Sequence, residues 1–175
     1  MGIGKKRERL EVQTKLPIAA LAFLAIILLG PVIASGGTER QTLIAELLQE
    51  VNLQRELSGK PPLRLDNRLT AAAQKHAKNM SEIFFFDHLS PDGRGVVERV
   101  TEEGYPWRAI AENIGAGLSL PKSMVKAWMN SQDHRDNLLS GEFNDVGIGY
   151  SKPLKNDRKL GHSHYWVLVF GARSK

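Results

Sequence analysis

The sequence predicts an α+β fold, in which helices pack around a small antiparallel sheet. Residues 39–57 and 66–83 carry apolar side chains at helical spacing. Residues 146–150 and 165–170, near the end of the chain, alternate in the manner of strands. The predicted order is helix, helix, helix, strand, helix, strand, strand, and this order favours the α+β class.

The first two helices are predicted from their apolar faces and their ends. Residues 39–57 place five apolar side chains on one face: Leu43, Ile44, Leu47, Leu48 and Val51. Residues 58–62 contain one glycine and two prolines, which end this helix. Asp66 is the predicted N-cap of a second helix, which continues to about Ile83.

The later elements are predicted from proline, glycine and alternation. Ser90 and Pro91 fit the N-cap and first position of a third helix, which runs to about residue 103. Pro121 fits the start of a fourth helix that ends near Leu139. Residues 111–117 form a short predicted strand. Residues 165–170 are apolar on both faces, as expected of a central strand.

The first 34 residues have the composition of an export segment. Five basic and two acidic side chains occupy residues 1–15, and residues 16–34 form an uncharged stretch of 19 residues. A basic flank before an apolar core is typical of export, because the basic residues stay on the cytoplasmic side. Either a signal peptide is cleaved near Ala34, or the stretch remains as a membrane anchor, which needs about 20 apolar residues. We favour the anchor.

The predicted organisation is therefore an export segment over 1–34, a short linker over 35–40 and one domain over 41–173. This predicts an extracellular or cell-envelope location, with residues 16–34 in contact with a membrane if they are not cleaved. The net charge is +5, and most of it lies in residues 1–15, so we expect no nucleic-acid partner. The absence of cysteine excludes disulfides, cysteine nucleophiles and thiolate metal sites.

The histidines direct the search for a functional site, because imidazole changes charge near neutral pH and commonly binds metals. His76 lies on the apolar face of the second helix, which predicts a buried structural role. His162 and His164 lie at a strand entrance, where exposed loop histidines are expected. His88 and His134 lie at the ends of predicted elements, where side chains are well placed to line a cleft.

Glu112 is the further candidate, because it lies on a short strand that is otherwise uncharged. A carboxylate in such a position is costly unless it is paired. The common motifs of zinc proteases, serine hydrolases and phosphate-binding loops are absent from the sequence. Spacing alone therefore does not connect Glu112 with His88 and His134.

Five segments in this order connect these residues by resemblance. They are His88-Leu89-Ser90-Pro91-Asp92-Gly93, Ala111-Glu112-Asn113-Ile114, residues 127–139, Val146-Gly147-Ile148-Gly149 and residues 165–171. Together they resemble the CAP superfamily, which holds cysteine-rich secretory proteins, venom antigens and plant pathogenesis-related proteins, and above all its cysteine-free bacterial branch. The resemblance implies a three-layer α-β-α sandwich and a secreted or surface location.

The resemblance also implies a shared cleft lined by two histidines and two acids. His88, Glu112 and His134 match three of these positions, but Ser131 stands where the second acid falls. Asp133 or Glu98 is a candidate substitute for that acid. His88, Glu112 and His134 together suit a divalent metal ion such as zinc, with one position left for water.

Three functions follow from these residues. We expect a non-enzymatic extracellular binding module whose His/Glu-lined cleft takes a metal ion, or a lipid or other cell-envelope component. The alternative is a metal-assisted hydrolase, in which His88 and His134 hold a metal that activates water and Glu112 is the base. In the third, the same residues only tie the helices to the sheet by hydrogen bonds.

Overall fold

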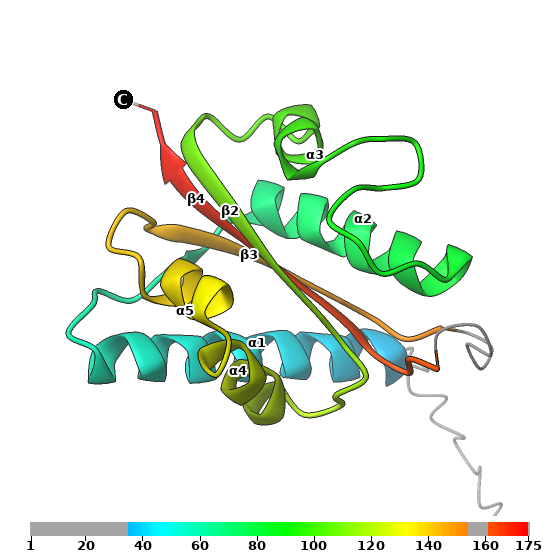
Figure 1. Cartoon of the computed structure of the whole chain (residues 1–175), viewed down its shortest axis with the longest axis horizontal. Helices are drawn as coiled ribbons and strands as arrows, with labels where there is room; N and C mark the ends of the chain where they lie inside the picture. Colours follow the sequence, from blue (N-terminus) through cyan, green and yellow to red (C-terminus); the bar gives the residue numbers. More distant parts are fainter. Residues whose placement is uncertain (1–34, 154–160, 175) are drawn as a thin grey trace, which may run out of the picture. The chain divides into compact units, whose positions relative to one another are not determined.

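The computed structural model describes residues 35–153 and 161–174, and the predicted export segment over 1–34 lies outside them. A sheet of four strands lies between two layers of helices (Figure 1). One face carries α2 (Asn67–Ile83) and α3 (Val96–Glu102), and the other carries α1 (Ser35–Leu57), α4 (Pro121–Met129) and α5 (Gln132–Leu139). The predicted α+β class and the α-β-α sandwich are confirmed. No helix within the described ranges is long and apolar enough to cross a membrane.

The sheet has the strand order β1-β3-β4-β2. Its strands are β1 (Arg64–Leu65), β2 (Trp107–Ala116), β3 (Asp145–Ser151) and β4 (Tyr165–Arg173). The three long strands pair antiparallel, but β1 pairs parallel with β3, so the sheet is mixed and not purely antiparallel. The parallel pair arises because the chain leaving α1 lies along β3 for two residues before Asp66 caps α2.

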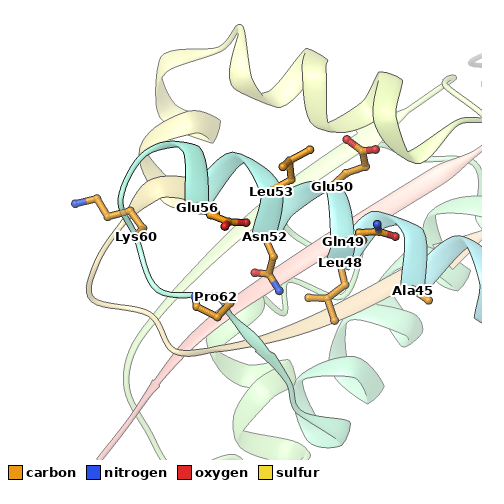
Figure 2. Close-up of a pocket in the computed structure, with 9 residues that line it drawn as sticks. All are labelled: Ala45, Leu48, Gln49, Glu50, Asn52, Leu53, Glu56, Lys60 and Pro62. Carbon is orange, nitrogen blue, oxygen red and sulfur yellow. The ribbon is translucent and has the colours of Figure 1, made fainter.

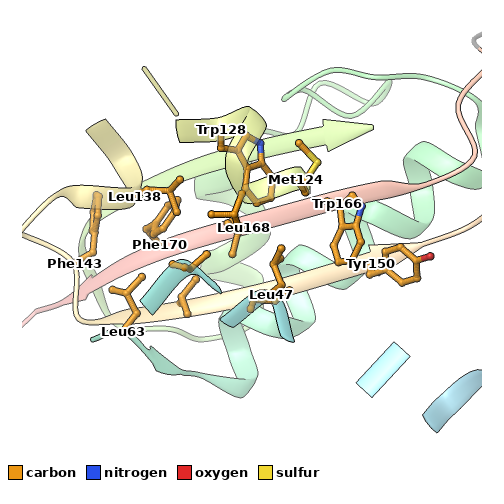
Figure 3. Packing of buried hydrophobic residues seen from close by; sticks show 14 of the residues in the cluster. Leu47, Leu63, Met124, Trp128, Leu138, Phe143, Tyr150, Trp166, Leu168 and Phe170 are labelled. Carbon is orange, nitrogen blue, oxygen red and sulfur yellow. The ribbon is translucent and has the colours of Figure 1, made fainter. Parts of the chain in front are cut away.

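Alternation along β3 and β4 supplies a separate core for each face of the sheet. The core facing α1 and α4 includes Leu47, Val51, Met124, Trp128, Val146, Ile148, Tyr150, Trp166, Leu168 and Phe170 (Figure 3). The core facing α2 includes Leu69, Ala73, Ala77, Tyr165, Val167 and Val169. Successive residues of β4 thus enter opposite cores, which explains why this central strand is apolar on both faces, as predicted.

Two glycines of β3 allow α2 to lie directly on the sheet. A Cβ atom on Gly147 would lie 2.0 Å from the carbonyl carbon of Leu69, and one on Gly149 would lie 2.2 Å from the carbonyl oxygen of Ala73. Any larger residue at either position must push the helix away. The alternation of Gly147 and Gly149 with large residues therefore sets how closely the helix layer packs on this face.

Two helix boundaries differ from the prediction. The third helix begins at Val96, because residues 90–93 form a turn in which Ser90 accepts a hydrogen bond from the backbone N–H of Gly93 at 2.8 Å. Gly93 has φ +83°, which is incompatible with a continuing helix. The predicted helix over 121–139 is two helices, since Ser131 is extended, with φ −102° and ψ 126°, between α4 and α5.

The first helix begins earlier than predicted. Residues 35–40, expected as a linker, form the first turns of α1. Glycine costs about 1 kcal/mol in a helix interior, but Gly36 and Gly37 lie in the first turn. The apolar face that follows buries Leu47 and Val51 completely, and this packing stabilises the whole helix.

Arg55 joins the end of α1 to the segment that follows α5. It is fully buried, and its guanidinium donates to the carbonyl oxygens of Pro61 at 2.8 Å and Leu138 at 2.7 Å. Further bonds reach the carbonyls of Ser140 at 2.9 Å and Phe143 at 3.3 Å. Burial lowers the pKa of Arg55.

Arg55→Met is expected to lower the free energy of unfolding by about 3 kcal/mol, because several buried carbonyls lose a charged donor. Arg40 lies exposed on the same helix, so Arg40→Met is the matched control and is expected to cost less than about 0.5 kcal/mol. Urea unfolding followed by tryptophan fluorescence measures both. Equal losses in the two variants would contradict the role given to Arg55.

Candidate functional site

Glu112 lies on β2 and is buried, with 7% of its surface exposed. Its neighbours two residues away, Ile110 and Ile114, belong to the core facing α2, so Glu112 points to that same layer. One carboxylate oxygen accepts a hydrogen bond from Nδ1 of His88 at 2.9 Å. The other accepts from Nη2 of Arg99 at 2.7 Å. The buried carboxylate is therefore paired on both sides, as a charge in this position requires.

Arg99 is the residue of the site that sequence reasoning missed. It lies on α3, only 5% exposed, and donates from Nη1 to the backbone carbonyls of His88 at 3.1 Å and Arg94 at 3.0 Å. It thus holds both Glu112 and the loop that carries His88. The signal in the sequence was its spacing, since Arg99 falls on the same helical face as Val96 and Val100.

The side chain of Asn113 lies on the opposite face of the same strand, toward α5. It is fully buried and donates from Nδ2 to the backbone carbonyl of His134 at 2.9 Å. Its own side-chain oxygen accepts from Nδ2 of Asn137, also at 2.9 Å. These two bonds fix α5 against β2. Adjacent residues of one edge strand, Glu112 and Asn113, therefore position His88 from one helix layer and His134 from the other.

Ser131 contacts His134 directly. The hydroxyl oxygen of Ser131 lies 2.8 Å from Nδ1 of His134, one turn along α5. Ser131 is the N-cap residue of α5, but its side chain makes no capping hydrogen bond and instead holds the imidazole. Each of the two cleft histidines is thus held through its Nδ1 atom, His88 by Glu112 and His134 by Ser131.

The two imidazoles have opposite shifts in pKa. The hydrogen bond that His88 donates to Glu112 is the main cause that raises the pKa of His88, against the opposing effect of burial. Burial lowers the pKa of His134, and the nearby charge of His88 lowers it further. The lowered pKa favours the neutral form of His134.

The other residues considered from the sequence lie in different surroundings. His76 is fully buried, and its Nε2 donates to the backbone carbonyl of Asp87 at 2.9 Å, in agreement with a structural role. His162 packs against Phe86, and His164 stacks on Tyr150, so both are half-buried and not simply exposed.

Neither candidate for the missing acid completes the cleft. Glu98 accepts from the backbone N–H of Gly95 at 2.9 Å, so its carboxylate caps α3. Asp133 acts on His134 through its negative charge, which raises the pKa of that histidine against the lowering effect of burial. Among the described residues, no three histidine or acidic side chains are grouped so that they can hold a metal ion.

A hollow of about 760 Å³ lies elsewhere, along the outer surface of α1 (Figure 2). It is lined by Ala45, Leu48, Gln49, Glu50, Asn52, Leu53, Glu56, Lys60 and Pro62. None of these residues belongs to the group around Glu112. The concave surface of α1 and the histidine pair are therefore separate features of the molecule.

Sequence comparison finds bacterial relatives. The chain is 33% identical over 105 residues to the uncharacterized protein YkwD of Bacillus subtilis, covering 60% of this chain and 41% of the relative. It is 25% identical over 130 residues to an uncharacterized protein of Borreliella burgdorferi, covering 74% of each. The chain thus spans less than half the length of the Bacillus relative.

Structure comparison agrees on the fold. An extracellular protein containing a SCP domain from Bacillus anthracis superposes with a TM-score of 0.70 at 23% identity, over 83% of this chain and 45% of that chain. An outer surface protein from Borrelia burgdorferi gives a TM-score of 0.67 at 21% identity, over 77% and 95% of the two chains. The model of the cysteine-rich secretory protein family, CAP, matches residues 48–170, which is well over half of the sequence. The chain therefore belongs to the CAP family.

Proposed function

We propose that this protein is an exported, non-enzymatic CAP module that binds its ligand between His88 and His134. The observation that carries the proposal is the way both rings are held. Nδ1 of each ring is engaged, by Glu112 at 2.9 Å and by Ser131 at 2.8 Å, which leaves Nε2 of each ring for a ligand. More than half of the His88 side chain is exposed, at 55%, so this ring is accessible.

A divalent metal ion such as zinc is the ligand that this arrangement suits best. Metal-binding histidines commonly use one ring nitrogen for the metal and donate from the other to a carboxylate or another oxygen. Glu112 and Ser131 fit this orienting role. The expected three-ligand set is therefore revised to two imidazole Nε2 atoms, with Glu112 as an orienting group. Other positions on the metal fall to water or to a second ligand.

The same contacts argue against the hydrolase alternative. A general base needs a free lone pair within hydrogen-bond reach of the proton that it removes. Each oxygen of Glu112 already accepts one hydrogen bond, at 2.9 Å from His88 and at 2.7 Å from Arg99, and the residue is only 7% exposed, so little of it is open to a substrate. Glu112 is thus better suited to orient His88 than to accept a proton. Binding of a lipid or another cell-envelope component remains a prediction from the resemblance.

We further propose that the module lies in the cell envelope, anchored by residues 16–34. The stretch is uncharged and preceded by basic residues. Two structures similar to this chain are described as an extracellular protein and an outer surface protein. These descriptions and the N-terminal sequence both support a location outside the cytoplasm.

Zinc binding tests the revised ligand set. Calorimetric titration at pH 7.5 is expected to detect weak binding that is lost in both His88→Ala and His134→Ala, because each removes one of two protein ligands. His164→Ala, outside the cleft, is the matched control and is expected to bind as the unaltered protein does. If no heat of binding is found, or if His88→Ala binds as before, zinc is not the ligand of this pair.

The pairing of His88 with Glu112 predicts a pH-dependent stability. Because the pKa of folded His88 is raised above its ordinary value of 6.5, the pair stabilises the fold below pH 6.5 and loses this effect as pH rises through the folded pKa. His88→Gln is therefore expected to lose more stability at pH 5.5 than at pH 8.5. Urea unfolding at both pH values measures the difference, and a loss that is larger at pH 8.5 is incompatible with this pairing.

Glu112→Gln is expected to lower the free energy of unfolding by about 3 kcal/mol, because it leaves Arg99 as a buried charge without its anion. Glu142→Gln is the matched control, since Glu142 pairs with Arg108 at 2.8 Å on the exposed surface. We expect a loss below about 1 kcal/mol for the control.

A double-mutant cycle separates the ion pair from other effects of the Glu112 change. Adding Arg99→Met to Glu112→Gln is expected to cost less than the sum of the two single changes, because the two side chains contact each other. Additive losses, measured by urea unfolding, would show that Glu112 and Arg99 act independently.

A further inference from the structure

Three large apolar side chains are exposed at one end of the domain: Phe86, Leu118 and Leu120, here called the entry face. Their exposed fractions are 41%, 37% and 61%. Single exposed apolar residues are ordinary, but a group of them marks a surface that contacts something apolar.

Contacts around His162 bring the residues of the entry face together from separate segments. Phe86, just after α2, packs against the ring of His162 with 5.7 Å between centroids. A Cβ atom on Gly117 would lie 3.8 Å from Nδ1 of the same histidine. The carbonyl of Leu118 accepts from Nε1 of Trp166 at 2.7 Å, and Leu120 precedes α4 by one residue. The α2 end and the loop from β2 to α4 thus meet around His162.

The first turns of α1 lie at this same end of the domain. Glu39 pairs with Lys152 at 2.6 Å, directly after β3. The last residue of β3, Ser151, pairs with Tyr165 at the start of β4, and Gly117 donates to the carbonyl of His164 at 2.9 Å. Figure 1 shows the start of α1, the end of α2 and the start of β4 at one end of the sheet.

We propose that the entry face lies against the lipid surface of the membrane that residues 16–34 enter. This inference rests on the proposed anchor. The helix α1 begins at Ser35, directly after the uncharged stretch ends at Ala34, so the two segments are adjacent in the sequence. Headgroups extend about 5–8 Å beyond the hydrocarbon core on each side. We therefore expect the end of the domain where α1 begins to meet the headgroup layer, and this end carries the exposed Phe86, Leu118 and Leu120.

Contact of the entry face with lipid would also fix the orientation of the whole domain relative to the membrane. Leu57, at the far end of α1, is 74% exposed. A helix of 23 residues is about 35 Å long at 1.5 Å per residue. If the entry face contacts lipid, Leu57 points away from the membrane into the aqueous space. The domain would then stand on one end, with both of its helix layers exposed to the solvent beside it.

Fluorescent labelling of the full chain in vesicles tests this orientation. The chain contains no cysteine, so Phe86→Cys, Leu120→Cys and Leu57→Cys each provide a single labelling site. An environment-sensitive dye such as NBD is attached, and the proteins are reconstituted into phosphatidylcholine–phosphatidylglycerol vesicles. The dye at positions 86 and 120 is expected to emit at shorter wavelength than at position 57, and to be quenched by brominated lipids.

The outcomes separate this inference from the anchor itself. If the chain sediments with the vesicles but dyes at 86 and 120 match the dye at 57, the anchor holds and the entry face is wrong. If the chain does not sediment with the vesicles, both proposals fail. A third outcome is a blue shift of the dye emission that grows with the protein-to-lipid ratio and is not accompanied by quenching from brominated lipids. It would indicate contact with a second copy of the chain, which also overturns the inference.

Discussion

The arrangement of His88 and its surroundings depends on one buried carboxylate. Glu112 on the edge strand β2 binds His88 on one side and Arg99 on the other, and the two side chains of the Glu112–Arg99 pair are only 2% and 5% exposed. Removing such a carboxylate from water is costly, and only two close donors offset the cost. Glu112 therefore requires both the loop that carries His88 and the helix that carries Arg99. The positions of α3 and of the loop after α2 follow from this requirement.

An edge strand is well placed to hold side chains from both helix layers. Among the strands that the structure describes, β2 pairs with β4 alone and forms one edge of the sheet, so side chains on its two faces reach both helix layers. Glu112 accepts a hydrogen bond from His88 in the α2–α3 layer, and its neighbour Asn113 donates one to the backbone of His134 in α5. Two adjacent residues thus hold both histidines in place. A ligand between the two rings would contact elements from all three layers. The binding function that we propose thus follows from the place of β2 in the sheet.

Much of the fold was predictable because apolar periodicity and burial agree along most of the chain. The stripe of α1, the Asp66 cap and the two-sided apolar strand β4 all occur as expected. The errors lie where local signals compete. Ser90 and Pro91 have the residue types of a helix start, but Gly93 at φ +83° continues a turn. Ser131 is extended between α4 and α5, which the apolar pattern over 121–139 did not reveal.

His88, Glu112, His134 and Ser131 were proposed as site residues from the sequence with the help of the family resemblance, but their contacts depend on geometry. Arg99 occupies one oxygen of Glu112; its spacing on α3 indicates that it is buried, but not which side chain it contacts. The central claim is that Glu112 holds His88 through Nδ1 and leaves Nε2 free. Long-range ¹H–¹⁵N NMR above the pKa of His88 tests it directly. We predict that the neutral ring carries its proton on Nδ1, whereas a proton on Nε2 would contradict the account.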